Sequence, residues 1–150
     1  MATQLKDFAT SIVAVVEPET SALVVAKIMR QHHVGALVVV DATLKTKPIG
    51  IVTDRDLVLE LMSQGLDPVV FTAGDVMTVD LVTANPEMDA LEAIQLMKKH
   101  RLRRLVVVDE EGRLMGIITM EDMLELLTRE LADLTAGLSG ARDREMVERT

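Results

Sequence analysis

The chain has 150 residues, of which 49% are hydrophobic and 27% are charged, so it is long and apolar enough to bury a sizeable core. It carries 24 acidic and 16 basic residues, a net charge of −8, which argues against broad nucleic-acid binding. It has no Cys, Trp or Tyr, which excludes disulfides, thiolate metal sites and Cys nucleophiles. Its apolar runs are too short to span a membrane, and we expect a soluble cytoplasmic protein.

The first half of the chain predicts a strand, a helix, two strands and a helix. Residues 1–11 are expected to form a short helix, and residues 12–16 a strand that ends before a proline. Residues 22–29 place apolar side chains at helical spacing behind Ser21, the expected N-cap. The apolar run that ends at Asp41 is typical of a strand buried on both faces.

A second apolar run, at residues 50–52, predicts the next strand, and a helix is expected to begin at Thr53. The second half of the chain then repeats the whole order. Residues 80–109 align without a gap with residues 12–41, and both end in Leu-Val-Val-Val-Asp. The match indicates an internal duplication of a β-α-β-β-α unit.

Each unit is too small to bury a core alone, so the two are expected to pack face to face around one shared core. The expected fold class is α/β (α+β), with a first repeat at residues 10–62 and a second at 73–127. Residues 128–150 are expected to be a helical extension, with Leu127, Leu131 and Leu134 on one side. We expect two glycines, Gly137 and Gly140, to interrupt it.

These features resemble a tandem pair of cystathionine-β-synthase (CBS) domains, the unit often called a Bateman module. The resemblance covers about residues 10–127. It rests on Asp75-Val-Met-Thr78 before the second copy, on the strand ending in Asp, and on Gly-h-h-Thr-x-x-Asp in both copies, where h is apolar. One departure is Val38 and Val106, where the family often has proline.

The resemblance implies two repeats related by pseudo-two-fold symmetry, with adenosine-containing ligands such as AMP, ADP, ATP or S-adenosylmethionine in the clefts between them. It also implies a homodimer formed through the helices of the pair. Family members regulate a linked enzyme or channel. The 150 residues leave no room for a catalytic domain, so this chain resembles the stand-alone members, which act on a separate protein partner.

The Thr-x-x-Asp motif allows two interpretations. Thr53 and Asp56, like Thr119 and Asp122, can form a capping box at a helix start. Alternatively, the Thr hydroxyl can bond a phosphate and the Asp carboxylate can accept hydrogen bonds from ribose hydroxyls. Both roles can coexist at the Thr.

By the resemblance, each cleft pairs the motif of one repeat with strand and loop residues of the other. The first cleft would contain Thr53, Asp54, Arg55, Asp56, Thr78, Leu81, Val82, Leu102, Arg103 and Arg104. The second would contain Thr10, Ile12, Ala14, Val34, Gly35, Thr119 and Asp122.

Charge distinguishes the two clefts. Arg55 in the first motif is available to a phosphate, whereas Glu121 stands at the matching position of the second and would repel one. A basic run at residues 98–104 is expected opposite the first motif, which favours AMP, ADP or ATP there. Mg²⁺ held by Asp54 and Asp56 could accompany ATP. The histidines do not have metal-ligand spacing, and no protein metal site is expected.

Three functions remain open from the sequence. The first is a non-enzymatic regulatory module that binds adenine nucleotides. The second is a ligand-free structural or dimerisation adaptor, and the same fold would also suit an S-adenosylmethionine or NAD-binding pair. The third, an enzyme acting on a nucleotide, is disfavoured because no activated nucleophile is visible.

Overall fold

A computed structural model describes residues 4–7, 9 and 14–149. The first half contains the 3₁₀ turn η1 (Leu5–Asp7), β1 (Val15–Val16), α1 (Ala22–His32), β2 (Ala36–Val40), β3 (Pro48–Thr53), α2 (Asp54–Asp56) and the π-helix η2 (Leu57–Met62). The second half contains α3 (Ala73–Val76), β4 (Thr83–Ala84), α4 (Ala90–His100), β5 (Arg104–Val108), β6 (Leu114–Thr119) and α5 (Met120–Arg149).

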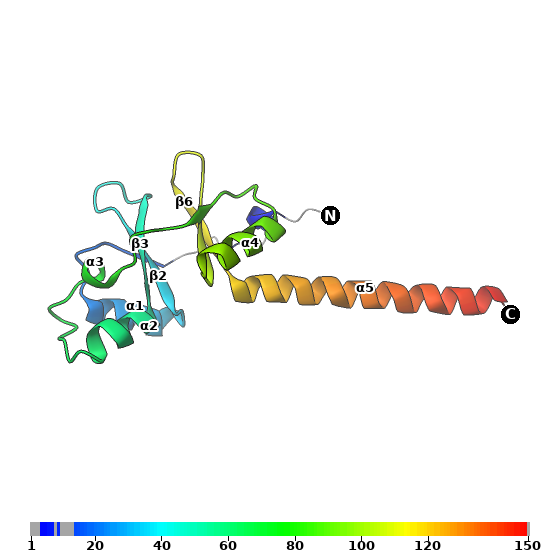
Figure 1. The fold of residues 1–150 in the computed structure, drawn as a ribbon, viewed down its shortest axis with the longest axis horizontal. Coiled ribbons are helices and arrows are strands. Elements are labelled where there is room, and N and C mark those ends of the chain that lie inside the picture. Colours follow the sequence, from blue (N-terminus) through cyan, green and yellow to red (C-terminus); the bar gives the residue numbers. More distant parts are fainter. Residues whose placement is uncertain (1–3, 8, 10–13, 150) are drawn as a thin grey trace.

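The strands form two three-stranded sheets of the same topology, β1-β2-β3 and β4-β5-β6. In each sheet the first pair is parallel and the second antiparallel, and the registers correspond: Val15 faces Val38, and Thr83 faces Val106. Both antiparallel pairs carry an irregularity at the same place, next to Val40 and Val108. The mixed α/β fold with two β-α-β-β-α repeats is therefore confirmed (Figure 1).

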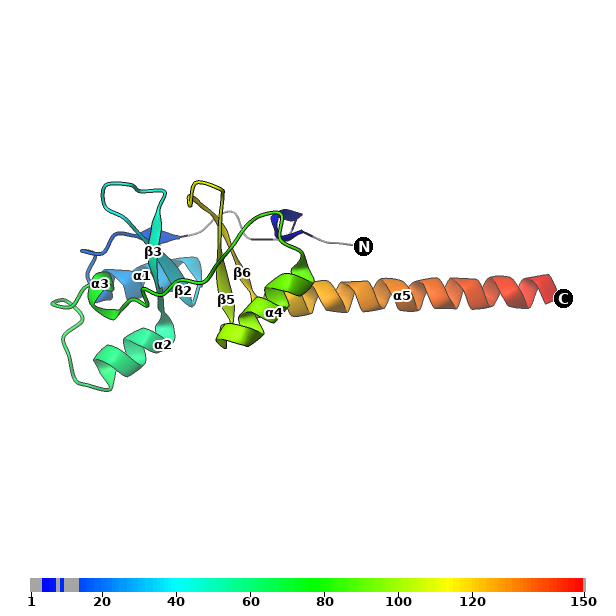
Figure 2. The same ribbon diagram turned by 45° about the horizontal axis from the view of Figure 1, so that its top comes forward.

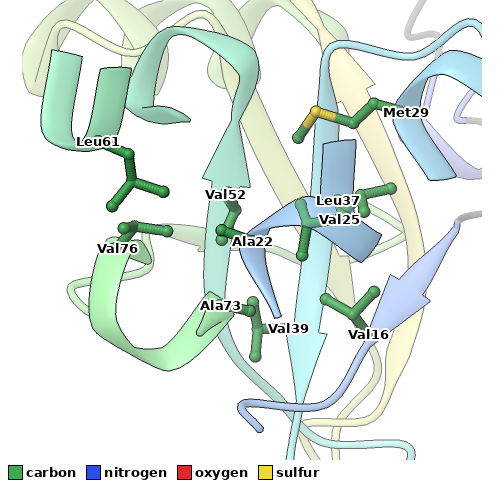
Figure 3. Packing of buried hydrophobic residues seen from close by; sticks show 10 residues of the cluster. All are labelled: Val16, Ala22, Val25, Met29, Leu37, Val39, Val52, Leu61, Ala73 and Val76. Carbon is green, nitrogen blue, oxygen red and sulfur yellow. The ribbon is translucent and has the colours of Figure 1, made fainter. Parts of the chain in front are cut away.

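Each repeat has its own hydrophobic core. The first core packs α1, β2, β3, η2 and α3 together, and Figure 3 shows its buried side chains. The second is formed by equivalent residues around α4, β5, β6 and the start of α5. A smaller cluster of buried residues, Val38, Val40 and Val106, lies between the two repeats. The two cores also exchange elements: α3, from the start of the second repeat, lies in the first core, and Leu5 of η1 lies in the second. The expectation of one shared core is wrong, because the described residues form two separate cores, but the exchange of α3 and η1 joins the two repeats into one module.

The helix starts follow the sequence closely. Ser21 is the N-cap of α1, and its side chain accepts a hydrogen bond from the backbone N–H of Val24. Asp89 occupies the equivalent N-cap position of α4 without a side-chain bond. Both helices end at equivalent left-handed residues, His33 (φ 53°) and Arg101 (φ 55°), whose backbone N–H groups bond carbonyls of the last turn. The duplication therefore extends to the caps.

Helix α5 differs from the prediction. It continues through Gly137 and Gly140 as one helix of 30 residues. Glycine lowers helix stability by about 1 kcal/mol each but does not block the hydrogen-bond ladder, as proline does. Figures 1 and 2 show that α5 starts beside α4 and then extends away from both sheets. No helix in the described part of the chain is long and apolar enough to cross a membrane.

Candidate ligand-binding site

The first Thr-x-x-Asp motif lies where β3 ends. Thr53 is the N-cap of α2, and its Oγ1 accepts a hydrogen bond from the Asp56 backbone N–H at 3.1 Å. In return, Asp56 Oδ2 accepts one from the Thr53 backbone N–H at 2.8 Å. Both side chains are half-buried. The capping box leaves the Thr53 hydroxyl proton and Asp56 Oδ1 for other partners.

The second motif has the same geometry at the end of β6. The Thr119 backbone N–H donates to Asp122 Oδ2 at 3.0 Å, and the Asp122 N–H donates to Thr119 Oγ1 at 3.0 Å. The capping interpretation therefore holds for both copies. It does not exclude the ligand interpretation, because each carboxylate and hydroxyl keeps hydrogen-bonding capacity.

Each motif is fastened to the start of the buried strand in its own repeat. The backbone N–H of Asp54 donates to the carbonyl of Gly35 at 3.0 Å, and that of Met120 donates to the carbonyl of Arg103 at 2.8 Å. Gly35 and Arg103 are therefore equivalent residues of the two repeats. The first has no side chain, and the second has a long cation.

The two repeats meet beside the first motif. A Cβ on Gly35 would lie 3.2 Å from Asp54 Oδ2 and 3.5 Å from a guanidinium nitrogen of Arg104. The guanidinium of Arg104, which belongs to the second repeat, thus lies close to Gly35 of the first. Arg104 therefore lies beside the first motif, and its part in ligand binding stays a prediction.

Arg103 lies instead beside the second motif. Its guanidinium donates to Glu121 Oε1 at 2.9 Å. The backbone N–H of Glu121 itself, followed by Arg103 and Arg104, holds the pKa of the Glu121 carboxyl below its ordinary value. The cation of Arg103 is therefore matched by an anion of the same repeat, and Arg104 lies within electrostatic reach of both motifs.

Sequence reasoning treated Arg103 and Glu121 separately and missed this ion pair. The signal was present in the duplication. Gly35 of the first copy is replaced by the cation Arg103 in the second. Arg55 of the first copy is replaced by the anion Glu121, so the second copy gains two opposite charges at these positions.

The other expected cleft residues are distributed more widely. Thr78 pairs with β3 through its backbone, donating to the Ile51 carbonyl at 2.9 Å and accepting from the Ile51 N–H at 3.1 Å. Leu81 packs on the cluster between the repeats. Val82 and Leu102 pack on the core of the second repeat and Ala14 on that of the first, and Val34 is exposed. Thr10 and Ile12 lie outside the described residues.

Within the part of the chain that the structure describes, no group of three or more His, Asp or Glu side chains is arranged to hold a metal ion. The first motif offers two carboxylates, the half-buried Asp56 and the exposed Asp54. Two carboxylates suit a cation such as Mg²⁺ whose other ligands are water and the phosphates of a nucleotide.

Comparison with other proteins places this geometry in a family. A sequence profile of the CBS domain matches residues 5–63 and 73–129. The CBS domain-containing protein YhcV of Bacillus subtilis is 38% identical over 134 residues, which are 89% of this chain and 89% of that protein. Protein MK0525 of Methanopyrus kandleri is 41% identical over 109 residues, or 73% of this chain, and that match spans about half (55%) of the relative.

A solved structure shows the same fold. The CBS domain pair of protein MJ0100, in complex with 5′-methylthioadenosine and S-adenosyl-L-methionine, superposes with a TM-score of 0.78 at 26% identity. The match covers 87% of this chain and 99% of that one. Because both repeats match the family profile and the fold follows a solved pair, this chain belongs to the CBS domain family and carries two CBS domains in tandem.

Proposed function

We propose that the chain is a non-enzymatic regulatory module that binds an adenine nucleotide in the cleft between its CBS domains and signals to a separate protein. The observation that carries the proposal is the half-buried Thr53–Asp56 motif with Arg104 of the other domain beside it. Support comes from the MJ0100 pair, which has the same fold and holds two adenosine compounds.

The first motif has the groups that a nucleotide needs. Asp56 Oδ1 can accept hydrogen bonds from ribose hydroxyls while Oδ2 stays in the capping box. The Thr53 hydroxyl can donate to a phosphate oxygen, and the exposed Arg55 adds a cation on the same turn. With ATP, the exposed carboxylate of Asp54 can hold Mg²⁺ together with the phosphates.

The charges favour the first motif for the phosphates. Arg55 and Arg104 lie on it or against it. At the second motif, the acidic Glu121 neutralises Arg103 and would repel an added anion. Thr119 and Asp122 can still bond an adenosine compound there, and an uncharged or cationic one suits that environment better. AMP, ADP and ATP are therefore expected at the first motif.

A matched pair of variants tests the assignment. Asp56→Asn keeps an oxygen for the Thr53 N–H, so the cap persists, but it removes the charge that binds ribose. We expect calorimetric titration with AMP and ATP to show about ten- to a hundredfold weaker binding, since hydrogen bonds to charged groups contribute about 1.5–3 kcal/mol. Asp122→Asn, the same change in the second domain, should leave this binding event unaltered. Equal affinity in wild type and Asp56→Asn would remove the first motif from the site.

A ligand-free adaptor is the second candidate function, and exposed apolar surface favours it. A groove of about 500 Å³ lies between α1 and η2 and is lined by apolar residues such as Leu23, Leu57 and Leu66. This groove fits the homodimer through CBS helices that the resemblance implies. Because the chain lacks Trp and Tyr, a co-purified nucleotide would dominate its ultraviolet spectrum. An adenine absorbance band after nuclease treatment would favour the nucleotide-binding module over the adaptor.

A further inference from the structure

Helix α5 carries a row of leucines that the other described residues do not cover. The row consists of Leu124 (60% exposed), Leu127 (42%), Leu131 (64%), Leu134 (62%) and Leu138 (63%). Met123, which precedes it, is buried in the second core, and Leu126 packs against that core. The helix is therefore anchored at its first turns, and beyond them it extends from the body as a single helix (Figures 1 and 2).

The spacing of the row is that of a coiled coil. The leucines alternate in steps of three and four residues, which gives a repeat of 3.5 residues rather than 3.6. Leu124, Leu131 and Leu138 occupy the a positions of a heptad, and Leu127 and Leu134 the d positions. A row of leucines at both positions is self-complementary, because knobs from one helix fit holes in an identical helix.

The glycines of α5 indicate that the helix needs a partner. Gly137 and Gly140 each cost about 1 kcal/mol in a solvated helix, and helices are stabilised mainly by packing an apolar face. A Cβ built on either glycine meets nothing within 4 Å, so the described part of the chain provides no such packing there. Both glycines lie outside the a and d positions, so they leave the leucine seam intact.

We propose that α5 pairs with α5 of a second copy of this chain in an antiparallel coiled coil. Leu131 of one copy then lies opposite Leu134 of the other, and Leu127 lies opposite Leu138. The seam runs from Leu124 to Ala141, which is about 27 Å of helix at 1.5 Å per residue. It is separate from the α1/η2 groove and from the proposed nucleotide site, so it does not depend on the proposed function.

Charge selects the antiparallel orientation. In a parallel pair, the exposed Glu145 would occupy an a position and face its own copy, which is repulsive. In the antiparallel pair, Glu145 lies level with Met120 instead. The same alignment brings Arg142 near Glu121 of the other copy on both sides of the seam.

Sedimentation equilibrium of the full chain tests the pairing. We expect the double variant Leu131→Glu with Leu134→Glu to have half the molecular mass of wild type in solution. The control Ala132→Glu with Ala136→Glu adds the same charges on the outer face and should keep the wild-type mass. A thermal melt followed by circular dichroism serves as the folding control: both variants should keep the unfolding transition of the CBS domains. Equal masses for the leucine variant and wild type, or a wild-type monomer at about 100 μM, a concentration that populates a micromolar dimer, would overturn the proposal.

The absence of native cysteine allows the orientation to be tested as well. Leu124→Cys and Ala141→Cys chains should form a cross-link with a short thiol reagent when they are mixed, because these positions lie level in the antiparallel seam. Each variant alone should remain uncrosslinked. Cross-linking of each variant alone, as a parallel seam would give, would overturn the antiparallel arrangement.

Discussion

At the scale of single residues, the two CBS domains use the same aspartate to close the turn after the buried strand. Asp41 Oδ1 accepts hydrogen bonds from the backbone N–H groups of Thr43 and Leu44, each at 2.8 Å. Asp109 Oδ1 likewise accepts from Glu111 and Arg113, at 2.9 and 2.8 Å. The invariance of this residue between the copies is explained by the turn and needs no role in ligand binding.

These bonds predict a pH dependence. The backbone N–H of Leu44, then that of Thr43, lowers the pKa of Asp41, and the Arg113 backbone N–H, followed by its side chain, lowers the pKa of Asp109. A carboxyl whose pKa is lower in the folded state stabilises the fold above its unfolded pKa. That stabilisation is lost as pH falls through the folded value.

We expect NMR titration to show both carboxyl groups ionising below the ordinary range for aspartate. Arg113→Gln removes the side-chain bond from Nε to Asp109 Oδ2 at 2.7 Å but keeps the backbone bond. In that variant the pKa of Asp109 should rise yet stay below its ordinary value, while Asp41 is unchanged. An ordinary pKa for Asp109 in wild type would contradict the turn geometry.

The residues of the site were predictable to different degrees. The capping box of Thr53 and Asp56 is local in sequence, so spacing alone identifies it. The approach of Arg104 to Gly35 joins residues of different domains, and no local pattern fixes such a distance. The pairing of Arg103 with Glu121 also spans two elements, and only the paired change between the copies pointed to it.

At the scale of elements, most strands and helices were expected near their observed positions because the apolar patterns are strong and occur twice. The π-helix η2 was not, since Leu57–Met62 also satisfies an ordinary helical pattern. Helix α5 was expected to break at Gly137 and Gly140. A glycine in a sequence predicts a helix end only when the following residues lack helical preference, and here charged helix formers follow.

The continuous helix makes a testable prediction. Gly137→Ala adds a methyl group in open space and should raise the stability of α5 by about 1 kcal/mol, because alanine is the better helix former. Hydrogen exchange of the amides around residue 137 should slow accordingly, while amides of β2 and β5 serve as the unchanged reference. Unaltered or faster exchange around residue 137 would show that the helix ends before the glycine.

At the scale of the whole molecule, the sequence indicated a duplication and a tandem pair, and both are confirmed. The packing between the repeats was not predictable. Each sheet packs on the long helix of its own domain, but the domains exchange short elements: α3 lies in the first core and Leu5 of η1 in the second. A valine cluster, the Arg104 contact and the bond from the Leu114 N–H to the Thr46 carbonyl at 2.7 Å add to the contact between the domains. A ligand between the domains transmits a signal only if it binds one relative arrangement of the domains better than another.

The central claim is that an adenine nucleotide binds between the two CBS domains. A thermal melt of ligand-free protein followed by circular dichroism, with AMP, ADP, ATP, S-adenosylmethionine and NAD each at about 1 mM, tests it most directly. A ligand with a dissociation constant near 10 μM adds about 2.7 kcal/mol and raises the midpoint by several degrees. We expect AMP, ADP or ATP to give the largest rise, and Asp56→Asn to reduce it. A midpoint that none of the five compounds shifts would contradict the proposed function and favour the adaptor.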